Sequence, residues 1–281
     1  MGTDRASGGA GETGNADWEW RIAPTRRPAQ RVVMRQRWER LLFLHWEVPA
    51  AALSPLLPPG LVLDTYEGRA FVGLVPFTMK GVRPVYLPAV PGLSNFHETN
   101  IRTYVHIAGR DPGVWFFSLD AANSFAVRLA RAWFKLPYHF ARMAMQDAPP
   151  RPEEAAELGG AGVTEVTDYR SERLWPPPVP ARLRVRYAPL GAPAAARPGT
   201  LEHFLAERYV LYAYKDQTLY QGRVHHTPYP LQSARVLDLE EDLIAAAGIP
   251  RAAAPPIAHY ASSVSVEVFP LHRQHGSEWG R

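Results

Sequence analysis

The chain has 281 residues and no cysteine, which excludes disulfide bonds, thiolate catalysis and cysteine-ligated zinc. Its 31 basic and 27 acidic residues give a net charge of +4, and the basic residues are scattered, whereas a nucleic-acid-binding surface needs them clustered. We therefore expect no nucleic-acid partner, and a hydrophobic fraction of 46% is typical of a globular protein with a sizeable core.

The N-terminal 30 residues are rich in Gly, Ala, Asp and Arg and show no apolar periodicity, which predicts a disordered tail. Residues 31–272 are predicted to form a single domain, followed by a short C-terminal tail at 273–281. The N-terminus lacks the apolar core of a signal peptide, and no apolar run approaches the roughly 18 residues of a membrane span. The sequence thus predicts a soluble cytoplasmic protein with no membrane partner.

The first part of the domain is predicted to be rich in strands. Residues 40–48 form a run of large apolar and aromatic side chains, which is typical of a buried strand. In the segment 49–61, Pro49 stands at the start and Pro58 and Pro59 near the end, and this indicates a short helix. Further strands are predicted at residues 69–82, 98–108 and 113–121.

A helix is predicted next, because Phe125, Leu129 and Trp133 recur at four-residue spacing and mark an apolar face. Pro137 forbids continuation of this helix and favours extended backbone before it. A strand is therefore expected to begin directly at residue 138.

The remainder of the chain is predicted to alternate strands with two short helices. The strands are expected at residues 181–187, 210–214, 219–226, 234–239 and 264–269, and the helices at residues 200–209 and 240–248. About ten strands with three or four short helices predict an α+β domain, built on a large and mostly antiparallel sheet or barrel.

Several motifs in this order resemble one known family. They are NIRTYV at residues 100–105, FFSLDA at 116–121, LPY at 136–138, FLAERYVLY at 204–212 and HTPYPLQ at 226–232. On these motifs the chain resembles, from residue 37 to 273, the YqjF-like family, a domain of unknown function within the acetoacetate decarboxylase-like superfamily. The resemblance implies a decarboxylase-like α+β fold, a mostly antiparallel β-barrel or double sheet with a few short helices. We expect no cofactor.

The resemblance also shows where this chain departs from the decarboxylases. In those enzymes the proline after the helix precedes two adjacent lysines, of which the first forms a Schiff base with the substrate ketone. The matching positions here are Tyr138 and His139, and neither side chain can form an imine. The family's acidic site residue aligns with Glu98, and its upstream arginine falls near Arg37 or Arg40.

Strand alternation places Glu98, Asn100 and Arg102 on one face of their strand. On the strand that follows the helix, Tyr138 and Arg142 share a face. The sequence therefore predicts a ligand site lined by Glu98, Arg102, Tyr138 and Arg142, whose guanidinium groups suit a small carboxylate or another polar ligand. The alternative is that these residues form a solvent-exposed face or a buried ion-pair network.

No metal site is predicted. The segment HETNI, at residues 97–101, begins like a zinc-binding helix but lacks the second histidine. His225 and His226 are adjacent on a predicted strand, so their side chains point to opposite faces.

These observations favour a small-molecule-binding protein. They are also compatible with an enzyme that does not use a Schiff base. Two alternatives stay open. One is a catalytically silent structural or partner-binding protein, and the other is a lyase acting on a 3-oxo acid through Lys135, although a lysine at a helix C-terminus is more simply a solvent-exposed residue. A homo-oligomer is compatible with the sequence.

Overall fold

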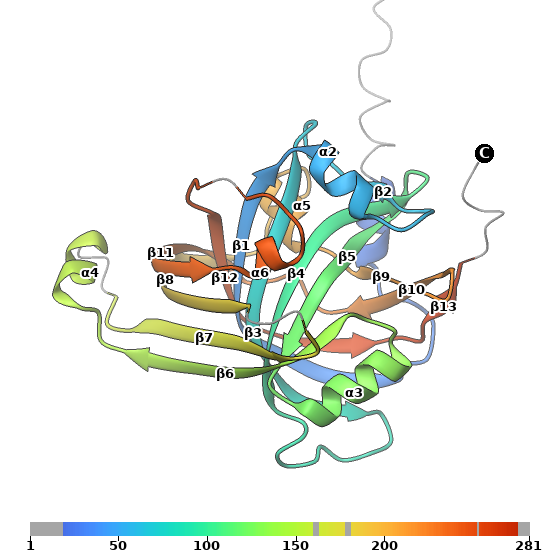
Figure 1. Ribbon diagram of the computed structural model, residues 1–281, viewed down its shortest axis with the longest axis horizontal. Helices are drawn as coiled ribbons and strands as arrows, with labels where there is room; N and C mark the ends of the chain where they lie inside the picture. The colour runs from blue at the N-terminus through green and yellow to red at the C-terminus, as the bar shows by residue number, and fades with distance from the viewer. Residues whose placement is uncertain (1–18, 160–162, 178–180, 252, 275–281) are drawn as a thin grey trace, which may run out of the picture.

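The computed structural model describes residues 19–159, 163–177, 181–251 and 253–274 (Figure 1). Its strands are β1 (Met34–Val48), β2 (Val62–Leu63), β3 (Ala70–Pro84), β4 (Phe96–Ile107), β5 (Arg110–Ala121), β6 (Tyr138–Ala148), β7 (Val166–Trp175), β8 (Arg182–Ala194), β9 (Val210–Lys215), β10 (Thr218–His225), β11 (Leu231–Glu241), β12 (Ile257–Val268) and β13 (His272–Arg273). Its helices are η1 (Ala23–Thr25), α2 (Ala50–Leu53), η2 (Ser54–Leu56), α3 (Ser124–Trp133), α4 (Pro152–Glu157), α5 (Leu201–Ala206) and α6 (Leu243–Ala246).

All the strands belong to one mostly antiparallel sheet in the order β13-β10-β9-β5-β6-β7-β8-β11-β12-β1-β3-β4-β2. The parallel pairs within it are β5–β6 and β5–β9. Two additional pairings, β4–β5 and β10–β12, connect distant parts of this order. The pairings therefore form a closed ring through β1, β3, β4, β5, β9, β10 and β12. The predicted α+β class, with a large antiparallel sheet and a few short helices, is confirmed.

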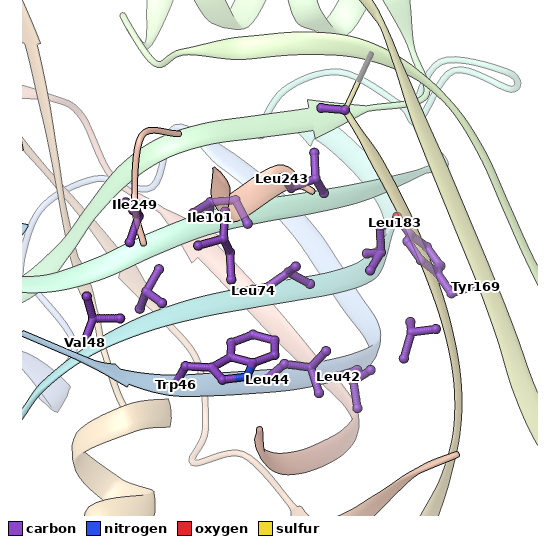
Figure 2. Close-up of a cluster of buried hydrophobic side chains, with 14 of the residues drawn as sticks. Leu42, Leu44, Trp46, Val48, Leu74, Ile101, Tyr169, Leu183, Leu243 and Ile249 are labelled. Atoms are coloured by element: carbon purple, nitrogen blue, oxygen red, sulfur yellow. The ribbon is translucent and has the colours of Figure 1, made fainter. Parts of the chain in front are cut away.

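The second half of β1, the first ten residues of β3 and most of β4 are largely buried on both faces. On one face Trp46, Leu74 and Ile101 join a core cluster that also contains Tyr169 and Leu183 of β7 and β8 (Figure 2). The other face is turned to the inside of the ring. Because side chains alternate along a strand, residues of β4 with even numbers, from Glu98 to Arg102, are turned to the inside.

Helix α3 differs from its prediction in the face that it buries. Val127 is fully buried, but Phe125 is 59% exposed and Leu129 is 45% exposed. The four-residue spacing therefore identified the helix correctly, while Phe125 and Leu129, two of the residues that carry it, remain exposed to solvent. Asn123 begins the helix by accepting hydrogen bonds at its Oδ1 from the backbone amides of Phe125 and Ala126, both at 3.0 Å.

Residues 19–30, which the sequence analysis assigns to the disordered tail, lie against the domain in the structure. Arg21 donates two hydrogen bonds to the carboxylate of Asp64, at 2.9 and 3.0 Å, and Pro24 is buried. Arg223 donates to the backbone oxygen of Pro24 at 2.9 Å. The sequence could not show these contacts, because they depend on single side chains and not on a periodic apolar face.

These contacts predict the effect of truncation. A chain that begins at Arg31 should be less stable than one that begins at Glu19 by roughly 2 kcal/mol, because Asp64 loses one of its two cationic partners and the buried proline is removed. Urea denaturation of the two truncated chains would measure the difference. Equal midpoints would mean that residues 19–30 add nothing to stability.

Candidate functional site

A cavity of about 190 Å³ lies inside the ring of strands. All seven strands of the ring and α3 contribute to its wall, which is mainly aliphatic and aromatic. The polar residues in this wall are Gln36, Trp38, Glu98, Asn100, Arg102, Tyr138, Arg208 and Tyr229. A dry cavity of about 150 Å³ can hold a benzene molecule, so the space suits a small organic ligand.

Glu98 and Tyr138 form one polar pair of the site. The hydroxyl of Tyr138 donates a hydrogen bond to Oε2 of Glu98 at 2.9 Å, and Glu98 is only 2% exposed. Burial raises the pKa of Glu98 to about 8, against the opposing effect of the Tyr138 hydrogen bond, and nearby Asp120 adds to the rise. The carboxyl group is therefore protonated at neutral pH and can both donate and accept a proton in the pH range where enzymes work.

Arg102 lies on the same strand face as Glu98 but forms no ion pair with it. Its Nη2 donates to the backbone oxygen of Leu205 at 3.0 Å, and its guanidinium lies 5.5 Å from the ring centre of Phe43. Among the described residues no carboxylate pairs with Arg102, and its Nε is buried without a partner. The cavity thus contains a buried cation whose charge is not neutralised by a direct ion pair.

Arg208 is a second cation in the wall, located just after α5. Its Nη1 donates to Asp64 at 2.8 Å and its Nε donates to the backbone oxygen of Phe204 at 2.8 Å. Burial alone would raise the pKa of Asp64, but Arg208 and Arg21 outweigh burial and keep this pKa below its usual value. The carboxylate is therefore ionised and positions Arg208, whose Nη2 remains without a partner.

Four residues of the cavity wall have buried polar atoms without a hydrogen-bond partner among the described residues. These atoms are Nε1 of Trp38, Oδ1 of Asn100, Nε of Arg102 and Nη2 of Arg208. Buried polar groups are satisfied in the great majority of cases. Four unsatisfied atoms in the wall of one cavity therefore leave this wall free to form hydrogen bonds with a polar group.

The structure brings together three of the four residues predicted for the site. Glu98, Arg102 and Tyr138 line the same cavity, whereas Arg142 is exposed and donates to Glu172 at 3.3 Å. Arg208 takes part in the wall although the sequence analysis did not select it. Arg208 is part of the motif FLAERYVLY, which could have identified it as a site residue. The sequence analysis instead interpreted residues 200–209, which include this arginine, as a helix.

The other residues considered from the sequence lie elsewhere. Lys135 places its ammonium group 4.9 Å from the ring centre of Tyr220, and it is not part of the cavity wall. The side chains of Arg37 and Arg40 pair with Glu39 and Asp147 respectively. Within the described segments no three potential metal ligands lie together, and no helix is long and apolar enough to cross a membrane.

The comparisons with known proteins agree with this architecture. The model of the DUF2071 family, described as an uncharacterized conserved protein, matches residues 35–265. The uncharacterized protein YqjF of Bacillus subtilis (strain 168) is 36% identical to this chain over 241 residues, which span 86% of this chain and 92% of YqjF. The resemblance to the YqjF-like family is thereby confirmed.

Three solved structures are similar in fold. The enduracididine biosynthesis enzyme MppR, complexed with pyruvate, has a TM-score of 0.56 at 13% identity, covering 88% of this chain and 93% of MppR. An acetoacetate decarboxylase-like enzyme from Sphingomonas wittichii RW1 has a TM-score of 0.56 at 14% identity, with 87% and 94% covered. Acetoacetate decarboxylase from Legionella pneumophila has a TM-score of 0.52 at 14% identity, with 89% and 94% covered. At these identities the likeness shows the fold alone.

Proposed function

This chain belongs to the DUF2071 family, and we propose that it binds a small carboxylic acid in the cavity inside the strand ring. The unsatisfied polar atoms of the cavity wall carry this proposal. Three of these atoms are donors, and two of the three belong to the guanidinium groups of Arg102 and Arg208. A carboxylate can accept from both, since arginine donates well to planar anions.

The composition of the rest of the wall limits the ligand further. Aliphatic and aromatic side chains dominate, so the part of the ligand away from the carboxylate should be apolar and short. The volume of about 190 Å³ favours an acid with few carbon atoms. MppR, which has the same fold, was solved in complex with pyruvate, a ligand of this class.

Glu98 gives the site the capacity for proton transfer. A carboxyl group with a pKa of about 8 is protonated at neutral pH, and its loss of a proton costs little near that pH. Tyr138 orients this group through the 2.9 Å hydrogen bond. An enzyme with this site would move a proton to or from the bound acid without an imine intermediate.

The ligand class is tested by measuring the binding of short carboxylic acids and of the corresponding neutral amides, which have the same shape. Calorimetry should detect the acids and not the amides. Arg102→Met and Arg208→Met should each weaken the affinity for an acid by at least about 30-fold, because each removes one charged hydrogen-bond donor. Arg142→Met is the matched control, since Arg142 is exposed and lies outside the cavity.

Two results would contradict the proposed ligand class. Amides that bind as well as acids would show that the arginines do not recognise a carboxylate. An Arg142→Met variant as impaired as Arg102→Met would show that the site lies elsewhere. Circular dichroism of each variant establishes that it is folded, and Arg102→Lys, which retains the charge, should keep part of the affinity.

The lyase alternative makes a separate prediction. Sodium borohydride should trap no covalent adduct of the protein with acetoacetate, because no lysine is found among the described residues that line the cavity. Mass spectrometry of the intact protein would measure this. An adduct that maps to Lys135 would restore the Schiff-base mechanism.

A further inference from the structure

One region of the surface gathers most of the large apolar side chains that this chain leaves exposed. Of ten such side chains among the described residues, six lie in the loop between β3 and β4 or on α3. They are Tyr86, Leu87, Val90, Leu93, Phe125 and Leu129, and we call them the apolar rim. The amide of Asn123 donates to the backbone oxygen of Leu93 at 3.0 Å, which joins the loop to the start of α3.

The loop itself has an unusual composition for an exposed segment. Residues 86–93 are all exposed, and the segment 84–94 contains no charged residue. Pro84, Pro88 and Pro91 restrict its backbone, so little conformational entropy is lost when the loop is immobilised. In Figure 1 this loop, drawn in teal, protrudes from the end of β3 beside α3. Exposed apolar patches of this kind mark interaction surfaces.

The two segments that carry the apolar rim have charges of one sign. Residues 80–95 and 124–135 together contain five basic residues and no acidic residue. The basic residues are Lys80, Arg83, Arg128, Arg131 and Lys135. A symmetric contact between two copies would bring these cations close to the same cations of the other copy. The repulsion between like charges opposes self-association through this surface. Charge complementarity therefore requires an anionic partner.

We propose that the apolar rim docks on the surface of an anionic lipid bilayer. The apolar side chains stand on a protruding loop and a helix, and a bilayer accepts protruding groups without a matching pocket. Tyrosine and leucine suit the boundary between head groups and acyl chains, and flanking arginines and lysines suit anionic head groups. An acidic protein would need a complementary groove to bury the same loop.

Peripheral docking agrees with the other features of the chain. The sequence predicts no membrane partner because no apolar run is long enough to span a bilayer, but docking at the surface needs no such run. Val82 and Leu129 are also part of the cavity wall, so a docked bilayer would lie next to the cavity. The docking surface does not depend on the nature of the cavity's ligand.

The test is flotation of the full-length chain with lipid vesicles. Vesicles of equal parts phosphatidylcholine and phosphatidylglycerol should bind the protein at least about tenfold more tightly than vesicles of phosphatidylcholine alone, and added salt should weaken the binding. The double variant Tyr86→Ser, Leu87→Ser should bind the mixed vesicles at least about tenfold less tightly, since it loses two apolar anchors. Arg128→Glu should lower the binding by about fivefold or more.

Two matched controls separate the apolar rim from the rest of the surface. Val62→Ser changes an apolar side chain that is 50% exposed, on β2, and Arg110→Glu changes an exposed arginine at the start of β5. Both should bind vesicles as the unaltered chain does. The proposal is overturned if no anionic vesicle binds the chain, or if the controls lose as much binding as the test variants. It is also overturned if light scattering finds an oligomer that fails to bind vesicles and that the Tyr86, Leu87 variant converts to monomers.

Discussion

Replacing Glu98 with glutamine is expected to stabilise the folded protein at alkaline pH by roughly 3–5 kcal/mol relative to the unaltered chain. The pKa of Glu98 is raised from 4.5 to about 8 in the folded state, mainly by burial. Between these two values the unfolded chain has lost the proton and the folded chain still binds it. Stability therefore falls as pH rises through this window, by about 1.4 kcal/mol for each pH unit.

The glutamine variant carries no ionisable group at this position, so this part of the pH dependence disappears. Its amide oxygen can still accept the hydrogen bond from Tyr138. Urea denaturation of both proteins at several pH values from 4 to 9 would measure the difference in unfolding free energy, which should be smallest near the lower limit and reach its full value above about pH 8. Glu157→Gln, which changes an exposed glutamate on α4, should follow the unaltered chain throughout. Parallel curves for Glu98→Gln and the unaltered chain would show that the buried carboxyl group is ionised.

This outcome differs from what the sequence alone suggests for Glu98 and Arg102. Two opposite charges four residues apart on one strand face suggest a mutually dependent ion pair, for which a single neutral substitution would be destabilising. In the structure the two residues share the cavity wall, but Glu98 pairs with Tyr138 and Arg102 with a backbone oxygen. Alternation along a strand determines which face a side chain occupies and not which partner it finds.

The sequence predicted the positions of Glu98, Arg102 and Tyr138 because each depends on local structure. Alternation places the first two, and Pro137 ends the helix directly before the third. Arg142 obeys the same alternation rule but lies outside the cavity. Strand β6 pairs with β5 only from Tyr138 to Phe140, and it then continues as a hairpin with β7 after a register shift at Phe140/Ala141. Figure 1 shows this hairpin extending away from the strand ring, with α4 at its tip.

Arg208 could not be predicted from local pattern, because distant contacts determine its position. Its partner Asp64 precedes it by 144 residues. The sequence indicated a helix through residue 209, whereas α5 ends at Ala206, and the three residues before β9 are not helical. The end of such a helix depends on where the following strand joins the sheet. The segment itself contains no helix-terminating residue that would mark this end.

Replacing Asp64 with asparagine is expected to destabilise the protein by roughly 3–5 kcal/mol, because it leaves Arg208 as a buried charge without a counter-ion. The side chain of Arg208 is 3% exposed, whereas that of Arg21, the other partner of Asp64, is 22% exposed and can regain contact with water. The cost should therefore arise mainly from Arg208. The low pKa of Asp64 adds a pH dependence of the opposite sign to that of Glu98, since this stabilisation is lost as pH falls through the folded-state pKa.

A double-mutant cycle isolates the interaction between Asp64 and Arg208. Arg208→Met removes the buried charge, so the double variant Asp64→Asn, Arg208→Met should be more stable than Asp64→Asn alone. Glu267→Gln is the matched control, because Glu267 also pairs with an arginine of residues 19–30, Arg27, but lies at the surface and should cost less than about 1 kcal/mol. Urea denaturation at neutral pH measures the unfolding free energies of the unaltered chain, the two single variants, the double variant and the control. If Asp64→Asn costs no more than the control, or if the double variant is no more stable than Asp64→Asn, the carboxylate does not neutralise Arg208. In that case another group must position this arginine in the cavity wall.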